Sequence, residues 1–510
     1  MLKNISKKKY WLLWLIVYPG WAMAQRMDGA SKKFHIEDPY SYQGAQLLNK
    51  ADNGYRGIWY FIGHLPDNPY VYKYAGGLST YPSNIYPFSV YVSKVDKTFF
   101  CYGGADDSSK TLYHEVAYYN HKTGKVSRPT IVLNKKTEDA HDNPCIQVDK
   151  KGYIWLFSNA HGTGRPAFIH RSVKPYDISE FKNIHPVKMQ DGKEVPMTNF
   201  SYLQIYYDNN HGFFGLFTHY SVQQLKSGRK PCRVAAYMTS SDGIHWSEWK
   251  DLANIEQGHY QTSGKRGKRI GTSFNYHPDV AKGAGLDHRT NLYYLFTDDY
   301  GKSWRTADGK VAKLPLTTIA NDALVHDYAS EDLKVYINDV NFDKDGNPVI
   351  LYETTRGWDP GPENGPQQWY TAHWNGMKWE ISPFITSDNN YDMGSLYIEA
   401  DGAWRVIAPT DNGPQQYNTG GSLVMWLSKD EGKSWLKIKE LTPNCENNQS
   451  YPRRPVNAPP DFYAFWADGN GRKPSKSHLY FSDKKGKVFV LPEKMESSEV
   501  SPIRVFTYDK

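Results

Sequence analysis

Two histidines, His141 and His161, are spaced in a way that suggests chemistry. They lie in the stretch EDAHDNPCIQVDKKGYIWLFSNAHGTGR, residues 138–165. Between them, an apolar run, a turn at residues 149–152 and a second apolar run form the pattern of a β-hairpin. Because the second strand of a hairpin returns to where the first began, we predict that both imidazoles lie at one end of it. They are either a proton-transferring pair or two ordinary loop residues.

Tyrosine and arginine occur at related places later in the chain. Aligned by its turn aspartate, NFSYLQIYYD places Tyr206 opposite Gln147, with Tyr202 four residues before it, near the position of Pro144. Other candidates precede or follow strand-like runs in the same way. They are Asn143, Arg269, Tyr276, His277, His288, Arg289, Asn390, Tyr391 and Asp392.

This mixture of side chains favours one reaction over others. Most glycosidases need a pair of carboxylates, and here Asp and Glu lie mainly in turns. The sequence has no serine nucleophile elbow, phosphate-binding loop or dinucleotide fingerprint. Histidine, tyrosine and arginine suit β-elimination on a uronic acid, in which a base removes the proton next to a carboxylate. Arginine or protonated histidine would neutralise that carboxylate.

A repeat along the chain provides the elements that position these residues. An alternating apolar run, an Asp-containing turn and a second apolar run recur, with turn markers Asp96, Asp149, Asp208, Asp287, Asp343, Asp401 and Asp461. TDDYGKSW and SKDEGKSW, with the shorter SSDGIHW, resemble the Asp-box, a structural hairpin turn of sialidase-like propellers. We therefore predict an all-β protein, with residues 25–510 forming one seven-bladed β-propeller domain. The alternative is a pair of β-sandwiches.

The N-terminus and the composition limit the cellular setting. Lysines, an apolar stretch and the sequence AMA predict a signal peptide over residues 1–24, and hence a secreted or periplasmic protein without a membrane span. The four cysteines are scattered, so a disulfide framework is not expected, although one bridge is compatible with export. The net charge of +7 fits an anionic ligand, and no basic stripe indicates nucleic acid. We expect a monomer.

Several stretches together resemble a known family. GYRGIWY, YKYAGGLSTY, AHDNPCIQVDKKGYIWLFSNAHG, GTSFNYHP and DHRTNLYYLFTDDYGKSW are similar to the BNR-repeat propellers of polysaccharide utilisation systems. The group includes ulvan lyases, rhamnosyl-glucuronate lyases and a related α-L-rhamnosidase set. The resemblance implies an enzyme that cleaves the rhamnose–(1→4)–glucuronate linkage of an acidic glycan by β-elimination. The alternatives are hydrolysis of the same linkage by one histidine, for which only His64 is near, and a non-catalytic glycan-binding propeller.

The resemblance also implies a set of site residues. His141 and His161 match the histidine pair of the lyases, and the tyrosine maps to Tyr202 or Tyr206. Arg269 is the first choice for the arginine and Arg233 the second. The expected substrate contacts are Asn143, Arg233, Tyr276 and Arg289. A structural metal, zinc or calcium, is implied with His277 and His288 as ligands and Cys232 or His326 as further candidates, and no organic cofactor is expected.

Overall fold

The computed structural model describes residues 45–79, 83–105, 111–162, 164–282 and 287–507. The predicted signal peptide, residues 1–24, and most of the segment that leads into the fold lie outside these residues. Within the described residues the regular elements are β-strands and short 3₁₀ turns. No helix in this part of the chain is long and apolar enough to cross a membrane.

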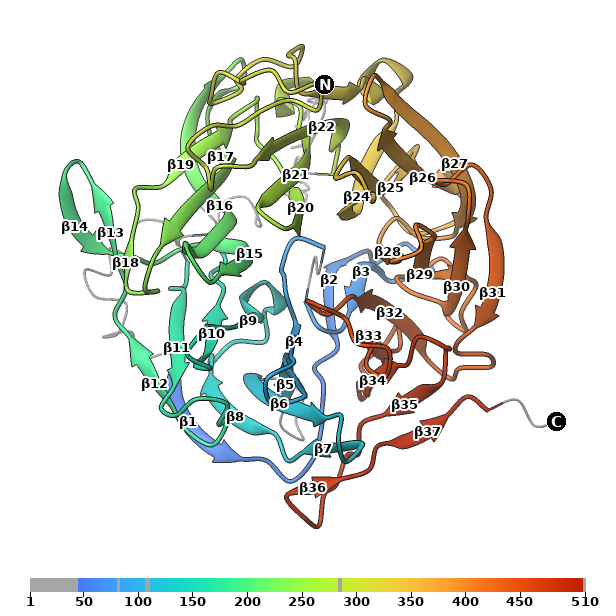
Figure 1. The fold of residues 1–510 in the computed structure, drawn as a ribbon. Helices are drawn as coiled ribbons and strands as arrows, with labels where there is room; N and C mark the ends of the chain where they lie inside the picture. Colours follow the sequence, from blue (N-terminus) through green and yellow to red (C-terminus); the bar gives the residue numbers. More distant parts are fainter. Residues whose placement is uncertain (1–44, 80–82, 106–110, 163, 283–286, 508–510) are drawn as a thin grey trace, which may run out of the picture.

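The larger sheets are antiparallel and stand radially around a common centre, as in a β-propeller (Figure 1). The first large sheet contains β4 (Ser89–Val92), β5 (Lys97–Ala105), β6 (Leu112–Asn120), β8 (Thr130–Asn134) and β1 (Gln46–Ala51), with β7 (Lys125–Ser127) and β36 (Glu499–Val500) at its side. The second contains β9 (Pro144–Val148), β10 (Ile154–Ser158), β11 (Phe168–Ser172) and β12 (Phe181–Ile184), and the third contains β15 (Ser201–Asp208), β16 (Gly212–Leu225), β17 (Gly228–Ser240) and β19 (Lys250–Ala253). The fourth contains β20 (Gln261–Arg266), β21 (Arg269–Tyr276), β22 (Thr290–Thr297) and β23 (Leu324–His326).

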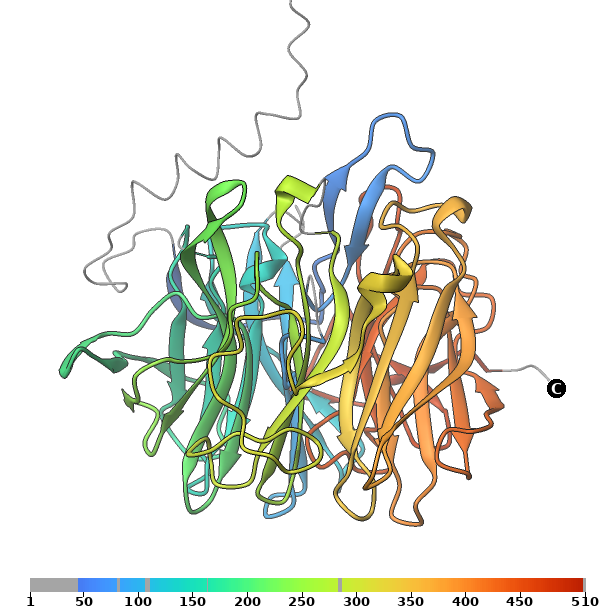
Figure 2. The same cartoon turned by 90° about the horizontal axis from the view of Figure 1, so that it is seen from above.

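The remaining sheets continue the ring. They are β24 (Lys334–Phe342), β25 (Pro348–Thr355), β26 (Gln367–Trp374) and β27 (Trp379–Ser387); β28 (Ser395–Ile398), β29 (Trp404–Asp411), β30 (Ser422–Ser428) and β31 (Leu436–Glu440); and β32 (Asn448–Arg453), β33 (Ala464–Gly469), β34 (Leu479–Ser482), β35 (Val488–Val490) and β37 (Ile503–Val505). Two small sheets project from the body: β2 (Tyr60–His64) with β3 (Tyr72–Gly76), and β13 (Val187–Gln190) with β14 (Lys193–Pro196) and β18 (His245–Trp246) (Figure 2). The 3₁₀ turns are η2 (Ala140–Asp142), η3 (Val280–Lys282), η4 (Tyr328–Glu331) and η5 (Pro362–Asn364).

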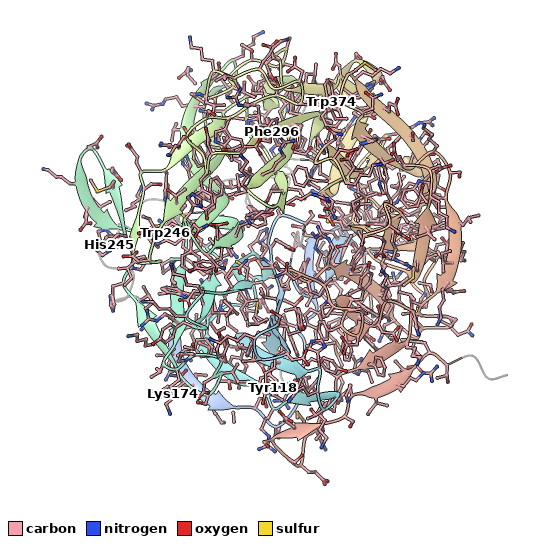
Figure 3. All side chains as sticks on the ribbon, viewed as in Figure 1. Tyr118, Lys174, His245, Trp246, Phe296 and Trp374 are labelled. Atoms are coloured by element: carbon pink, nitrogen blue, oxygen red, sulfur yellow. The ribbon has the colours of Figure 1, made fainter. Side chains whose placement is uncertain are left out.

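The Asp-box turns follow the third strand of a sheet, and their aromatic residues pack on the neighbouring sheet, which is the structural role expected of them. In TDDYGKSW the Asp299 carboxylate accepts from the backbone N–H of Ser303 at 2.9 Å, and Gly301 has φ +85°. The turn directs Trp304 against Tyr237 of the preceding sheet, with ring centroids 5.3 Å apart. The Trp of SSDGIHW, Trp246 (labelled in Figure 3), likewise packs against Phe157 of the preceding sheet, with ring centroids 6.4 Å apart. The aromatic residues of these turns therefore bury surface between sheets.

A segment of chain occupies the centre of the ring. Residues 83–88 run beside β15, where Tyr86 N–H donates to Leu203 O at 3.1 Å and Ile205 N–H donates to Tyr86 O at 2.8 Å (Figure 1). Below this level Gln204 accepts from Ser263 N–H at 2.6 Å and donates to Gln261 O at 2.9 Å. These buried amides fill the middle of the ring, so the two mouths are separate places. The four cysteines are buried and unbridged.

Candidate active site

The two histidines of the opening hairpin meet at one mouth of the ring. The His141 and His161 rings stack with centroids 3.8 Å apart and an interplanar angle of 7°. η2 positions His141 just before β9, and His161 follows β10, whose register with β9 pairs Ser158 with Pro144. The hairpin thus brings together side chains that are twenty positions apart. His161 is the more exposed ring, with 25% of its side-chain surface accessible against 9% for His141.

One carboxylate holds both rings. Asp139 accepts from His141 Nδ1 at 2.5 Å and from His161 Nδ1 at 2.8 Å. Since a carboxylate only accepts, the proton of each neutral ring lies on Nδ1 and its lone pair on Nε2. Burial alone would raise the pKa of Asp139, but the charge of and hydrogen bonds from the two imidazoles hold it well below its usual value. Burial, and then the neighbouring His161, lower the pKa of His141.

A second layer of charge fixes Asp139. Arg165 Nη2 donates to Asp139 at 2.6 Å, and its Nε donates to the fully buried Asp142 at 2.8 Å. Lys135 Nζ lies 3.4 Å from Asp142 and donates to the carbonyl of Asn159 at 2.7 Å. Arg165 and Lys135 balance the charges of Asp139 and Asp142, so the histidine pair is held by a hydrogen-bonded group of residues with almost no net charge.

A bulge aims Tyr202 at this pair. β15 is irregular between Ser201 and Gln204, and Tyr202 has φ +52°, an uncommon value for a non-glycine residue. Its ring meets His141 edge-on at 5.9 Å. Asn159 ties the two sheets together, because its Nδ2 donates to Asn143 O at 2.8 Å and its Oδ1 accepts from Leu203 N–H at 2.8 Å.

Two tyrosines connect Arg233 to the histidine pair. It pairs across β16 and β17 with Tyr220, and its guanidinium carbon lies 5.4 Å from that ring. The Tyr220 ring in turn passes within 3.6 Å of a Cβ position at Gly162, next to His161. Arg233 also lies 5.9 Å from the Tyr260 ring, which packs on Tyr202 at 5.3 Å. The site therefore continues from imidazole to tyrosine to guanidinium.

Arg289 extends the positive charge around the mouth. Its guanidinium lies 4.7 Å from Tyr260 and 4.5 Å from Tyr336, and it donates to the Tyr391 hydroxyl at 3.4 Å. His277 contacts Tyr260 at 4.9 Å. Burial and the nearby arginines lower the pKa of His277 well below its usual value, so this ring is neutral. Two arginines and neutral imidazoles form a surface that attracts a carboxylate.

Several predicted site residues lie elsewhere. Arg269, the first choice for the arginine, forms a two-pronged ion pair with Asp298 at 2.9 and 2.7 Å and covers Phe296, labelled in Figure 3. It begins β21, whereas Tyr276 ends that strand, about 23 Å away at 3.3 Å per residue. The structure thus places Arg269 at the far end of the sheet, and Arg233 and Arg289 supply the guanidinium groups at the histidine mouth.

Two tyrosines and an asparagine among the predicted site residues also do not face the histidine pair. Tyr206 donates to or accepts from Ser263 Oγ at 2.9 Å and faces the opposite mouth, so of the two alternatives only Tyr202 joins the histidines. Tyr276 points between sheets towards Tyr293, because alternate residues of a strand face opposite ways. Asn143 is fully buried, and its side chain donates to Ala140 O at 2.9 Å, so it supports η2 rather than facing a substrate.

The predicted metal ligands do not form one group. His288 packs on Trp358 at 4.2 Å, Cys232 contacts Asn254 Oδ1 at 2.8 Å, and His326 pairs with Glu331. In the described ranges, the histidine, cysteine and carboxylate atoms close enough to share an ion are those of Asp139, His141 and His161. Arg165 already binds that carboxylate, which disfavours a cation there. His64 lies at the end of the projecting strand β2, apart from the pair.

The sequence-based reasoning did not find the supporting residues. Asp139, Asp142, Lys135, Arg165, Asn159, Tyr220 and Tyr260 all shape the site. Asp139 could have been predicted from the sequence, because it is an acidic residue two positions before His141 at the start of a turn. The others come from separate repeats, and their proximity depends on how the sheets are arranged.

Comparisons with known proteins agree with this architecture. Residues 91–387 match the family described as BNR repeat-containing family member. An ulvan lyase of Alteromonas sp. (strain LOR) is 25% identical over 354 residues, which cover 63% of this chain and 69% of that protein. The Ulvan Lyase-PL25 of Pseudoalteromonas sp. (strain PLSV) is 26% identical over 370 residues, covering 64% and 70%.

A solved structure shares the fold. A PL25 ulvan lyase superposes with a TM-score of 0.63 at 19% identity, covering 86% of this chain and 97% of the other, and the same enzyme is known bound to -[GlcA(1-4)Rha3S]-. The polysaccharide lyase Uly1 has a TM-score of 0.56 at 12% identity, covering 85% and 99%. The chain is thus a nearly all-β protein with a propeller-like fold. It belongs to the BNR repeat-containing family.

Proposed function

We propose that this protein is a polysaccharide lyase that cleaves rhamnose–(1→4)–glucuronate linkages of an acidic glycan by β-elimination. The observation that carries the proposal is the pair of stacked imidazoles on Asp139, next to Tyr202 and the Arg233 guanidinium. The similarity to ulvan lyases supports it. A neutral imidazole with its lone pair on Nε2 can act as a general base.

Each residue has a role that its position permits. Arg233 and Arg289 bind the glucuronate carboxylate and reduce the cost of negative charge that builds up at C5. His161, the more exposed ring, takes the C5 proton on Nε2, and the C4–O4 bond breaks as the C4–C5 double bond forms. The Tyr202 hydroxyl returns a proton to the departing O4 oxygen. The products are a 4,5-unsaturated uronate and a new hydroxyl end, so atoms and charges balance.

The wider features of the protein follow as parts of the same proposal. The sheets with four or more strands in the described part of the chain correspond to seven blades of one domain. Residues 1–24 act as a signal peptide that directs the protein out of the cytoplasm. The exported protein can then meet polymeric glycans. The protein acts as a monomer and uses no organic cofactor.

The test is to incubate the purified protein with rhamnose–glucuronate glycans and to follow far-ultraviolet absorbance together with released sugar. Elimination creates a conjugated double bond that absorbs, and hydrolysis creates none. Absorbance that rises in step with chain cleavage supports the proposal. Released rhamnose without absorbance would establish a hydrolase instead, and tight binding without any cleavage would establish a glycan-binding propeller.

A further inference from the structure

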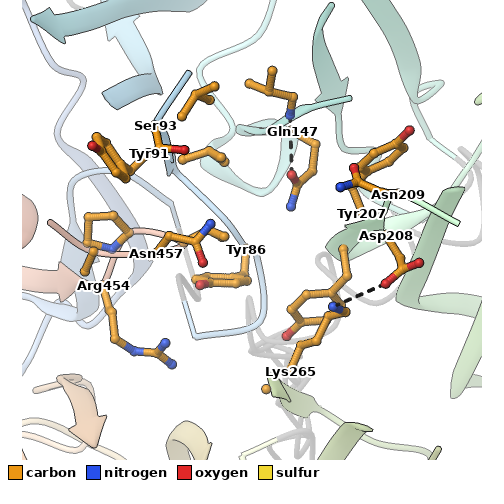
Figure 4. Close-up of a pocket in the computed structure, with 18 of the residues that line it drawn as sticks. Tyr86, Tyr91, Ser93, Gln147, Tyr207, Asp208, Asn209, Lys265, Arg454 and Asn457 are labelled. Carbon is orange, nitrogen blue, oxygen red and sulfur yellow. Dashed lines mark hydrogen bonds and ion pairs between the residues drawn. The ribbon is translucent and has the colours of Figure 1, made fainter. Parts of the chain in front are cut away.

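The mouth opposite the histidines contains a second cavity, of about 790 Å³. Figure 4 shows Tyr86 at its centre, with Arg454, Asn457 and Lys265 around it. The wall comes from the inner hairpins of several sheets, as at the histidine mouth. A volume of this size is that of a typical small-ligand site. Its lining residues include none of His141, His161 or Tyr202, so a ligand here would not touch the reaction centre.

The charge at this cavity is unbalanced in favour of anions. Two guanidiniums, Arg453 and Arg454, share the single buried carboxylate of Asp339, with nitrogen–oxygen distances of 3.9 and 3.4 Å. Arg453 is 2% exposed and donates to backbone carbonyls at 3.0 and 3.1 Å, whereas Arg454 keeps 19% of its side chain accessible and lines the cavity. The excess positive charge is thus presented by Arg454, whose Nε is buried and has no hydrogen-bond partner.

The acidic residues of the wall do not cancel this charge. Asp149 accepts from the backbone N–H of Lys151 and Tyr153 and from Trp155 Nε1, all at 2.9–3.0 Å. Glu399 accepts from Arg405 at 2.9 Å and from the Tyr463 hydroxyl at 2.7 Å, and it pairs with Lys484. Arg405 and Lys484 balance the charge of Glu399, and the hydrogen bonds of Asp149 occupy its oxygens within its own turn. Asp208, the third acidic residue of the wall, lies 3.9 Å from Lys265 Nζ and balances it (Figure 4), so Lys94 and Lys150 supply the further positive charge.

The uncharged part of the wall fits a sugar. The cavity is lined by the tyrosines Tyr86, Tyr91, Tyr176, Tyr206, Tyr207, Tyr397 and Tyr463. Side-chain amides of Gln147, Asn209, Asn341 and Asn457 stand between them. Aromatic surfaces pack on the C–H faces of sugars, and amides and hydroxyls can bond sugar hydroxyls. An inorganic anion would use only the cations and leave most of this wall without contacts.

We propose that this cavity is a second, non-catalytic binding site for a uronate-bearing oligosaccharide, whose carboxylate pairs with Arg454. Holding the polymer at a second point raises its effective concentration at the histidine mouth. This second site rests on the proposed lyase function only for the choice of the oligosaccharide used to test it. A binding site could be present whether or not the histidines are catalytic.

The experiment uses the His161→Ala protein, which keeps the probe intact, and a glucuronate–rhamnose hexasaccharide in calorimetry. We expect binding that Arg454→Gln weakens about tenfold or more, since a charge-assisted hydrogen bond is lost. Asn457→Asp should also weaken it, because Asn457 has φ +55°, which aspartate tolerates, and the change adds only a negative charge. Thermal unfolding of each variant checks that the fold is kept.

Controls separate the sources of the signal. The same hexasaccharide with its carboxyls reduced to alcohols should bind weakly and be indifferent to Arg454→Gln. Free glucuronate that binds as tightly as the hexasaccharide would show a site for a monosaccharide acid and overturn the oligosaccharide assignment. Unchanged hexasaccharide affinity in both folded variants, Arg454→Gln and Asn457→Asp, would overturn the site altogether. A wild-type protein without lyase activity would bear on the proposed function alone, because the calorimetry requires no cleavage.

Discussion

The two mouths of the ring are built from the same hairpins but differ in how their charges are used. At the histidine mouth, Asp139 accepts hydrogen bonds from two imidazoles, and arginines lie among aromatic rings. At the opposite mouth, carboxylates such as Asp149 bond the backbone of their own turns. Turn aspartates stabilise the fold, whereas an aspartate that holds a titratable ring can prepare it for proton transfer. Chemistry is therefore expected at only one of the two mouths.

Replacing either histidine of the pair should have the largest effect on activity and tests whether the reaction takes place at this mouth. We expect His161→Ala and His141→Ala each to lower kcat about 10²- to 10⁴-fold, the range for a general acid–base group. Initial rates of absorbance increase provide the measurement. Variants that keep more than a tenth of the activity would move the reaction centre away from these rings.

A smaller effect is expected from the arginine at the same mouth. Arg233→Gln should lower kcat/KM about 10²- to 10³-fold, because one donor to the developing charge is removed. Arg269→Gln is the matched control, since this arginine pairs with Asp298 at the far end of β21. It should leave kcat/KM within about twofold of the wild type, a surface ion pair having little effect. Equal losses in both variants would contradict the assignment.

Acid should destabilise the histidine mouth. His259 Nδ1 donates to Asn275 O at 2.7 Å, its Nε2 accepts from Ile255 N–H at 2.9 Å, and burial lowers its pKa to about 4. The unfolded chain binds this proton near pH 6.5 and the folded chain does not, so stability falls as the pH drops from about 6.5 to about 4. The loss approaches about 3 kcal/mol at pH 4. Urea unfolding at several pH values measures it, and the slope should flatten in His259→Asn.

The smallest effect concerns the tuning of the pair. Burial lowers the pKa of His141, and Asp139 opposes that shift. The neutral ring is the active form, so kcat/KM should decline as the pH falls through the apparent pKa of the coupled pair. In Asp139→Asn the opposing charge is gone, and the acid limb of the remaining activity should move to lower pH. A limb that moves to higher pH would show that Asp139 acts in another way.

Much of the fold could be predicted from periodicity. Alternating apolar runs with Asp–Gly turns specify hairpins locally, and the Asp-box places Trp304 between sheets without further information. The stacking of His141 on His161 follows from the same local rule, because β9 and β10 are joined by a short turn. Contacts within one hairpin are close in sequence, and a pattern of period two is enough to locate them.

The choice among equivalent residues required the tertiary structure. Tyr202 and Tyr206 lie on one strand and are both candidates, and only the bulge at residues 201–204 aims Tyr202 at the histidines. Arg269 has a basic, strand-edge context like that of a site residue, yet it begins β21 at the end opposite to Tyr276. Sequence spacing gives the order of residues along a strand but not which end faces the ligand.

By itself the sequence determined the strands, their turns and the one histidine hairpin, because these depend on neighbours a few residues apart. The partners of that hairpin, among them Arg165, Tyr220, Arg233 and Arg289, come from loops and from other sheets. Their distances are set by how the sheets pack around the centre and by residues 83–88, which fill it. Packing between sheets depends on the shapes of many side chains at once, which no short stretch of sequence specifies.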